Sequence, residues 1–164
     1  MAFDREELKQ KAQNKAKENK AFLAKLKKKR PKSLDEEAQQ LHHEVFSYTD
    51  CLGCANCCKS ISPIVTNRDV DRLANHLRLR PREVIEQYLV LDDDNDYIFR
   101  ETPCPFLMPD NYCMVYSARP RACREYPHTD RKRLYQITTL TYKNTFICPA
   151  AFDVVEGLKP IFDK

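Results

Sequence analysis

Eight cysteines are the residues of this 164-residue chain that are best suited to chemistry. Four of them lie in one run, Cys51-Leu52-Gly53-Cys54-Ala55-Asn56-Cys57-Cys58. Two-residue gaps let a tight turn direct successive thiolates at one centre. The first three spacings match a bacterial 4Fe-4S run more closely than the separated cysteine pairs of most zinc sites. The run therefore predicts a metal centre, and its spacing favours an iron–sulfur cluster over zinc.

The other four cysteines are single residues further along the chain: Cys104, Cys113, Cys123 and Cys148. Side chains of adjacent residues usually diverge, so we expect Cys58 to serve a second centre or to bridge within a larger cluster. Eight thiolates would fill two four-ligand sites. One division places Cys51, Cys54, Cys57 and one distant cysteine on the first metal, and Cys58 with the other three on the second. Other pairings stay open.

The alternative is a disulfide framework, the usual interpretation of an even cysteine count in a secreted protein. The amino-terminal stretch is charged and has no apolar signal segment. No run of about 18 apolar residues predicts a membrane span. We therefore expect a cytoplasmic protein, in which thiols stay reduced and available to metal.

Several cysteine motifs follow one another in a characteristic order. After the run come Cys104-Pro105-Phe106-Leu107, then residues 113–127 with the segment Arg119-Pro120-Arg121-Ala122-Cys123-Arg124, and then Cys148-Pro149. Over about residues 48–150 this order resembles the bacterial cysteine-cluster family of the YkgJ type, described as chelating zinc or iron. The resemblance implies metal ions as partners. It also implies a distant relation to flagellin lysine N-methylase, an iron–sulfur methyltransferase.

Two arginines match the R-P-x-x-C-R motif of that family, Arg119 and Arg124. Clustered thiolates need nearby positive charge, and we predict that both arginines lie beside the metal ligands and supply it. The alternative is that they pair with surface carboxylates such as Glu125, because arginine is seldom buried without a partner.

The charge distribution predicts a basic extension. Residues 1–32 hold 12 Lys and Arg against four Asp and Glu, whereas the whole chain has a net charge of +4. We expect a helical extension over residues 1–32 and a cysteine-cluster domain over residues 33–164. The extension should run as a helix from Asp4, its N-cap, to Arg30, before Pro31. Its lysines are suited to nucleic acid or another anionic partner, although the aromatic residues of a base-stacking platform are missing.

The remaining patterns predict an α-rich small α+β domain organised around cysteine-ligated metal. A capping box at Ser33 should start a helix that reaches about Phe46. This helix carries His42 and His43, either of which could complete a site if the eight cysteines did not suffice. Thr66 and Pro81 should open two helices that pack as a hairpin over the cysteine region.

Two short strands and two glycines complete the expectations. β-branched and aromatic residues predict a short strand over 97–99 and a longer one over 134–142. The chain has only two glycines, so it has no Gly-rich phosphate loop. Gly53 should supply a positive φ in the cysteine run, and Gly157 should end a short helix that begins at Pro149.

Three functions fit these patterns. The first, which we favour, is a metal-binding protein with a structural, redox or metal-handling role. The second is a metal-dependent enzyme, either a methyltransferase or a redox catalyst, which needs an open coordination position. The third is an RNA- or ribosome-associated protein with structural metal. Whether the chain is an enzyme stays open.

Overall fold

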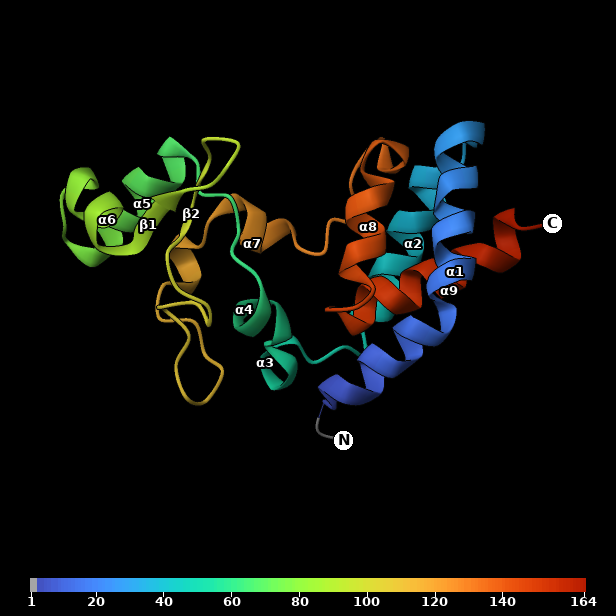
Figure 1. The fold of residues 1–164 in the computed structure, drawn as a ribbon, viewed down its shortest axis with the longest axis horizontal. Coiled ribbons are helices and arrows are strands. Elements are labelled where there is room, and N and C mark those ends of the chain that lie inside the picture. Colours follow the sequence, from blue (N-terminus) through green and yellow to red (C-terminus); the bar gives the residue numbers. More distant parts are fainter. Residues whose placement is uncertain (1–2) are drawn as a thin grey trace. The chain divides into compact units, whose positions relative to one another are not determined.

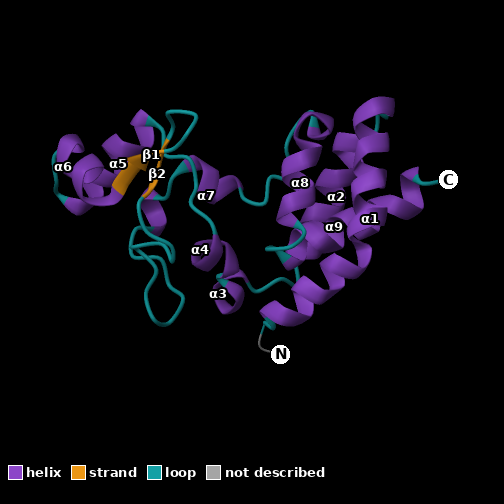
Figure 2. Ribbon diagram, viewed as in Figure 1, coloured by secondary structure: helices purple, strands orange, loops and turns teal. Residues whose placement is uncertain are grey.

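A computed structural model describes residues 3–164 of the chain, which form two compact units. Unit 1 joins Met1–Cys51 to Pro127–Lys164, and unit 2 is Leu52–Tyr126. Both units are mainly helical, and the only sheet of the described residues has two strands (Figures 1 and 2). The α-rich α+β prediction is therefore confirmed for secondary structure. The expected boundary at residue 32 stays a prediction, and the compact units have different bounds.

Unit 1 is a group of helices drawn from both ends of the chain. They are α1 (Arg5–Lys29), α2 (Leu34–Phe46), the 3-10 turn η2 (Leu134–Ile137), α8 (Thr138–Asn144) and α9 (Pro149–Phe162). In Figure 1 the blue helix α1 lies beside the red helix α9, and α1 also contacts α8. The basic helix is thus packed along one side by the rest of unit 1.

Helix α1 begins and ends where its caps predict. The Asp4 carboxylate accepts hydrogen bonds from the N–H groups of Glu6 and Glu7, and Arg30 takes a left-handed conformation with φ 47° before Pro31. The buried side chains lie on one stripe of the helix: Leu8, Ala12, Asn19, Phe22, Leu23 and Leu26. Burying each large apolar side chain contributes roughly 1.5–3 kcal/mol, and the lysines between them face solvent.

Helix α2 has the expected bounds, but not the expected cap. Ser33 makes no side-chain capping bond. The Asp35 carboxylate accepts hydrogen bonds from the N–H groups of Arg133 and Leu134, at 2.6 and 3.0 Å, and so ties α2 to the start of η2. The capping-box prediction was wrong because a distant segment uses the acidic residues of this turn.

The strand predicted over residues 134–142 was wrong, because this segment forms η2 and α8. Its buried positions are Leu134, Thr138, Thr141 and Asn144, which recur at helical spacing. The hydroxyl of Thr141 donates to the carbonyl of Ile137, four residues earlier, at 3.0 Å, so this polar group is satisfied within the helix. Packing against α1 outweighs the β propensity of the threonines.

Gly157 also has a different role from the one expected. Helix α9 begins at Pro149, as predicted, but it continues through Gly157 to Phe162. A Cβ atom on Gly157 would lie 2.9 Å from Cδ2 of Leu41. The glycine therefore permits close packing of α9 on α2.

Unit 2 contains short elements around a second apolar core. They are α4 (Asn56–Ser60), α5 (Asn67–Leu77), α6 (Pro81–Tyr88), β1 (Leu89–Leu91), β2 (Tyr97–Phe99), the 3-10 turn η1 (Tyr116–Ala118) and α7 (Arg121–Glu125), and α3 (Cys51–Cys54) leads into the unit. The strands pair antiparallel with Leu89 opposite Phe99, which confirms the predicted strand at 97–99. Helices α5 and α6 pack together as the predicted hairpin.

The core of unit 2 lies between the helical hairpin and the segments that carry two of the cysteines. Val70, Leu73 and Val84 of the hairpin are buried with Phe106 and Val115. Cys104 and Cys113 pack against this cluster. The hairpin therefore forms an apolar support for these two thiols, as the sequence predicted.

Asp69 is the buried polar residue that connects α5 to α7. One carboxylate oxygen accepts from the N–H and the hydroxyl of Thr66, both at 2.8 Å, which completes a capping box. The other accepts from the Arg72 guanidinium and, at 3.0 Å, from the N–H of Arg121. Burial acts to raise the pKa of Asp69, but these hydrogen bonds outweigh it and the pKa lies below its ordinary value.

No helix of residues 3–164 is both long enough and apolar enough to cross a membrane.

Replacing Asp69 by Asn should lower the free energy of unfolding by about 3 kcal/mol at neutral pH, because a helix cap and charge-assisted hydrogen bonds are lost together. Since the folded-state pKa is depressed, the carboxylate stabilises the fold above its unfolded pKa, and this contribution is lost as pH falls through the folded pKa. Urea denaturation should show the difference between wild type and Asp69→Asn shrinking in acid. Asp71→Asn, at an exposed site of the same helix, is the control. Equal effects of the two substitutions would contradict the role of Asp69.

Candidate metal centre

The cysteine run folds as two short helical turns joined at Ala55. Helix α3 carries Cys51 and Cys54, and α4 carries Cys57 and Cys58. Ala55 takes the left-handed conformation with φ 46°, whereas neither glycine of the chain has a positive φ. The prediction for Gly53 was therefore wrong. The reversal between the turns falls two residues later, and the buried side chain of Ala55 occupies it.

Cys104 and Cys113 lie on the two arms of a hairpin. Leu107 and Cys113 form an antiparallel bridge. The N–H of Met108 donates to the carbonyl of Tyr112, and the N–H of Met114 donates to the carbonyl of Phe106, both at 2.9 Å. These bonds fix the separation of the two cysteines, although eight residues lie between them in the sequence.

A backbone hydrogen bond brings this hairpin to the cysteine run. The N–H of Cys104 donates to the carbonyl of Cys58 at 2.8 Å. The amide of Asn111, in the turn of the hairpin, also donates to the carbonyl of Gly53, at 3.4 Å. The hairpin therefore contacts both turns of the run.

Cys123 is placed by helix α7. This helix follows Pro120, and the N–H of its first residue, Arg121, donates to Asp69. The Arg72 guanidinium, which binds Asp69, also donates to the carbonyl of Arg119 at 3.2 Å. The start of α7 is thus held against α5 by the charged groups at the beginning of that helix.

Four thiols of unit 2 interact electrostatically with one another: Cys58, Cys104, Cys113 and Cys123. None of the four is in a disulfide. The pKa of Cys104 is raised to about 11 and that of Cys123 to about 12. Burial is the largest cause in both cases, and the neighbouring thiols contribute to both increases. Burial and Cys58 raise the pKa of Cys113. All four thiolates can form together only if a cation compensates their charge.

Hydrogen bonds to sulfur favour the thiolate form at three positions. The N–H groups of Phe106 and Leu107 donate to the sulfur of Cys104, and the N–H of Val115 donates to that of Cys113. A hydrogen bond from Cys57, with smaller contributions from the charges of Arg119 and Lys59, lowers the pKa of Cys58 to about 7. These contacts partly offset the cost of burying charged sulfur.

Arg119 supplies positive charge to three of the four thiols, Cys58, Cys113 and Cys123. Its Nε donates to the carbonyl of Tyr116 at 2.9 Å, and its guanidinium lies 3.8 Å from the centre of the Tyr116 ring. Glu125 pairs with Arg121, at 2.6 Å, and not with Arg119. Arg124 is exposed and lines a pocket beside α5. Its predicted contact with the metal ligands stays a prediction.

Cys57 lies close to the four-thiol group, because its Sγ is 4.0 Å from the Sγ of Cys58. The expectation that these adjacent side chains diverge was wrong. Sulfurs bound to one tetrahedral zinc at about 2.3 Å lie about 3.8 Å apart, so this separation suits a shared centre. Cys54 also belongs to unit 2, whereas Cys51 and Cys148 belong to unit 1.

A metal site with closed geometry is not already formed. In residues 3–164 no three His, Cys, Asp or Glu side chains are gathered as the ligands of one ion. The donor set nevertheless suits zinc or an iron–sulfur cluster, because both prefer thiolates and four cysteines complete either site. The four sulfurs would approach one another further around such a centre.

His42 and His76 have polar contacts with groups other than cysteine sulfur. Nδ1 of His42 is 2.8 Å from the Thr129 hydroxyl, and Nε2 is 3.8 Å from the Asp130 carboxylate, all within unit 1. Burial lowers the pKa of His42. His76 is exposed, and its Nε2 lies 3.3 Å from the carbonyl of Met114.

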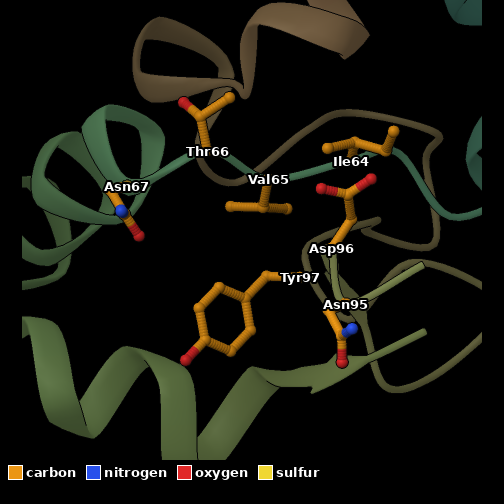
Figure 3. Close-up of a pocket in the computed structure, with 7 residues that line it drawn as sticks. All are labelled: Ile64, Val65, Thr66, Asn67, Asn95, Asp96 and Tyr97. Carbon is orange, nitrogen blue, oxygen red and sulfur yellow. The ribbon is translucent and has the colours of Figure 1, made fainter. Parts of the chain in front are cut away.

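Two pockets open on unit 2, and neither is lined by a cysteine. Figure 3 shows the smaller one, of about 360 Å³, with Asn67 on one side and Asn95 and Asp96 on the other. The larger, of about 460 Å³, lies at the start of α5 and α7. The thiol group is thus separate from both pockets.

Sequence reasoning identified the cysteines but missed the residues that join their segments. The motif Thr66-x-x-Asp69 predicted a helix start, and it gave no sign that Asp69 also binds the backbone of α7. The N–H groups of Phe106, Leu107 and Val115 donate to cysteine sulfur, and the side chains of these residues give no indication of that role. Tertiary contacts alone define these roles.

Comparison with known proteins identifies the family. The profile of the CxxCxxCC family, described as "putative zinc- or iron-chelating domain", matches residues 50–148. The chain therefore belongs to this family of metal-chelating domains, which confirms the resemblance seen in its cysteine motifs.

A relative is the uncharacterized protein MJ0661 of Methanocaldococcus jannaschii. It is 32% identical to this chain over 102 residues, which are 59% of this chain and 53% of the relative. The match thus spans about half the length of that protein. No solved structure matches the chain.

Replacing Arg119 by Gln should weaken zinc binding about tenfold, the lower end of the range for outer-shell residues, because three thiolates lose a compensating charge. Competition titration of the metal-free protein with zinc and a chromophoric chelator would measure the change. Arg124→Gln is the matched control within the same motif, and it should change the affinity much less. Equal losses in both variants would instead support the original prediction for Arg124.

Proposed function

We propose that this chain is a cysteine-ligated metal protein with two metal centres, which stabilise the fold and serve a redox or metal-handling role. The observation that carries the proposal is the grouping of Cys58, Cys104, Cys113 and Cys123 in unit 2. These cysteines come from α4, a hairpin and α7. A backbone hydrogen bond joins the hairpin to α4, and the Asp69 carboxylate holds the start of α7 at α5.

The first centre takes these four thiols as its ligands. Buried thiols with pKa values of about 11 and 12 are protonated at neutral pH, so a metal must displace their protons to bind. The hydrogen bonds to sulfur and the charge of Arg119 lower the cost of that step. Four thiolates around one cation also remove the mutual repulsion that would otherwise oppose folding.

The second centre lies at the cysteine run. The evidence for it is the spacing of Cys51, Cys54 and Cys57, which is that of an iron–sulfur run. Cys57 is also a neighbour of the first group, at 4.0 Å from Cys58. We propose iron–sulfur clusters as the metal species, since this spacing is closer to a cluster run than to zinc pairs. Such clusters supply one-electron transfer when bound.

The other two functions have less support. A metal-dependent enzyme needs a substrate pocket beside an open coordination position, and neither of the pockets described above is lined by a cysteine. Neither the family description nor the name of MJ0661 mentions RNA, so neither supports an RNA-associated role of α1. The stripe of α1 that faces the bundle is explained by packing within unit 1.

Protein purified without oxygen should contain iron and acid-labile sulfide in equal amounts, with broad absorption near about 400 nm, because both centres are proposed as iron–sulfur clusters. Elemental analysis and a sulfide assay on the same sample would measure this. Zinc without sulfide or colour would overturn the iron–sulfur assignment and leave the ligand groups intact. Protein without any metal, purified or reconstituted, would overturn the proposed function.

The grouping of the ligands predicts a pattern of metal loss. Cys104→Ser should remove about half of the bound metal, and Cys113→Ser should remove the same half, because both residues serve the first centre. Cys54→Ser should remove the other half, and Cys54→Ser combined with Cys104→Ser should remove nearly all of it. Metal content of the folded fractions, checked by circular dichroism, gives the result. If Cys54→Ser and Cys104→Ser each removed all of the metal, the two groups would form one centre.

A further inference from the structure

The larger pocket of unit 2, which we call the arginine pocket, is lined by four arginines. They are Arg68 and Arg72 of α5 and Arg121 and Arg124 of α7. Its volume is about 460 Å³, which is within the range of small-molecule sites. Arg124 follows Cys123 directly in the sequence and Arg121 precedes it by two residues, yet the pocket itself is lined by no cysteine.

The one carboxylate of the arginine pocket does not balance this charge. Asp69 is 1% exposed, and its oxygens already accept from Thr66, from Arg72 and from the backbone of Arg121. Arg121 pairs with Glu125, but side chains that are 71% and 47% exposed form a weak pair. Arg68 and Arg124 are both exposed and add two further charges. The pocket is therefore strongly basic.

The pocket also has unused hydrogen-bond donors. Nε of Arg72 is buried and has no hydrogen-bond partner in the described structure. Helix α5 is eleven residues long and begins at the pocket, so its dipole adds to the positive potential. An anion with several oxygens would supply acceptors for these groups.

We propose that the arginine pocket binds the phosphate group of a small phosphorylated molecule. A guanidinium group donates two parallel hydrogen bonds to two oxygens of a phosphate. A single carboxylate cannot accept hydrogen bonds from several arginines to the same extent. The volume leaves room for the organic part of such a ligand. RNA is a poorer fit, because no lining residue is aromatic and base stacking supplies much of the affinity for single strands.

The proposal is tested by titration calorimetry of the full chain in phosphate-free buffer, with inorganic phosphate and with phenyl phosphate. We expect saturable binding of phenyl phosphate with a Kd below about 1 mM. Arg68→Gln and Arg124→Gln should each weaken it about tenfold, because each loses a charge-assisted hydrogen bond. Arg82→Gln is the matched control. It removes an equal charge from the exposed pair of Arg82 with Glu86 on α6, and it should leave the affinity unchanged.

Three outcomes would overturn the proposal. The first is no binding of either phosphate, and the second is an equal loss in Arg82→Gln, which would indicate general electrostatic attraction. The third is binding of a 12-nucleotide RNA, but not of phenyl phosphate, through Arg68 and Arg124, which would make the surface a nucleic-acid site. The measurement reports anion binding and not metal binding, so its failure would leave the proposed metal centres untouched.

Discussion

The electrostatic interaction of four thiols is the constraint on which unit 2 depends. Burial and the neighbouring thiols raise the pKa values of Cys104, Cys113 and Cys123, so these thiols and Cys58 cannot all ionise without compensating charge. Left as thiols, they are small, weakly polar side chains beside an apolar core. Bound to a cation, they join three segments that have little regular secondary structure between them. Metal binding and folding of this unit are therefore expected to be coupled.

Two parts of unit 2 support the thiols, the helical hairpin and the pair formed by Asp69 and Arg72. The helical hairpin of α5 and α6 supplies the apolar surface on which Cys104 and Cys113 pack. Asp69 and Arg72 fix the start of α7 and the carbonyl of Arg119, so that one ion pair positions both the segment that carries Cys123 and the nearby Arg119. Asp69 is buried, whereas the Arg72 side chain is 37% exposed. Removing Arg72 would leave a buried carboxylate with less compensating charge, which is costly.

Local signals explain which parts of this architecture could be predicted from the sequence. The caps of α1 and α5 and the prolines that open α6 and α9 act within one turn, and all of them were found where expected. The predictions that were wrong concern places where contacts with a distant segment determine the local structure. Asp35 binds the backbone of residues 133 and 134, Leu41 packs over Gly157, and α1 covers the threonines of α8. The grouping of the cysteines depends on the bond from Cys104 to Cys58, which has no signature in either residue.

Helix α7 links the two proposed sites of unit 2. It has only five residues, and a helix of this length is not stable by itself. Cys123 belongs to the thiol group, whereas Arg121 and Arg124 line the arginine pocket. A metal bound through Cys123 would restrict α7, and the two arginines would then lose less conformational entropy on binding an anion. Because such coupling is reciprocal, a phosphate bound in the pocket would also favour the metal-bound arrangement of Cys123.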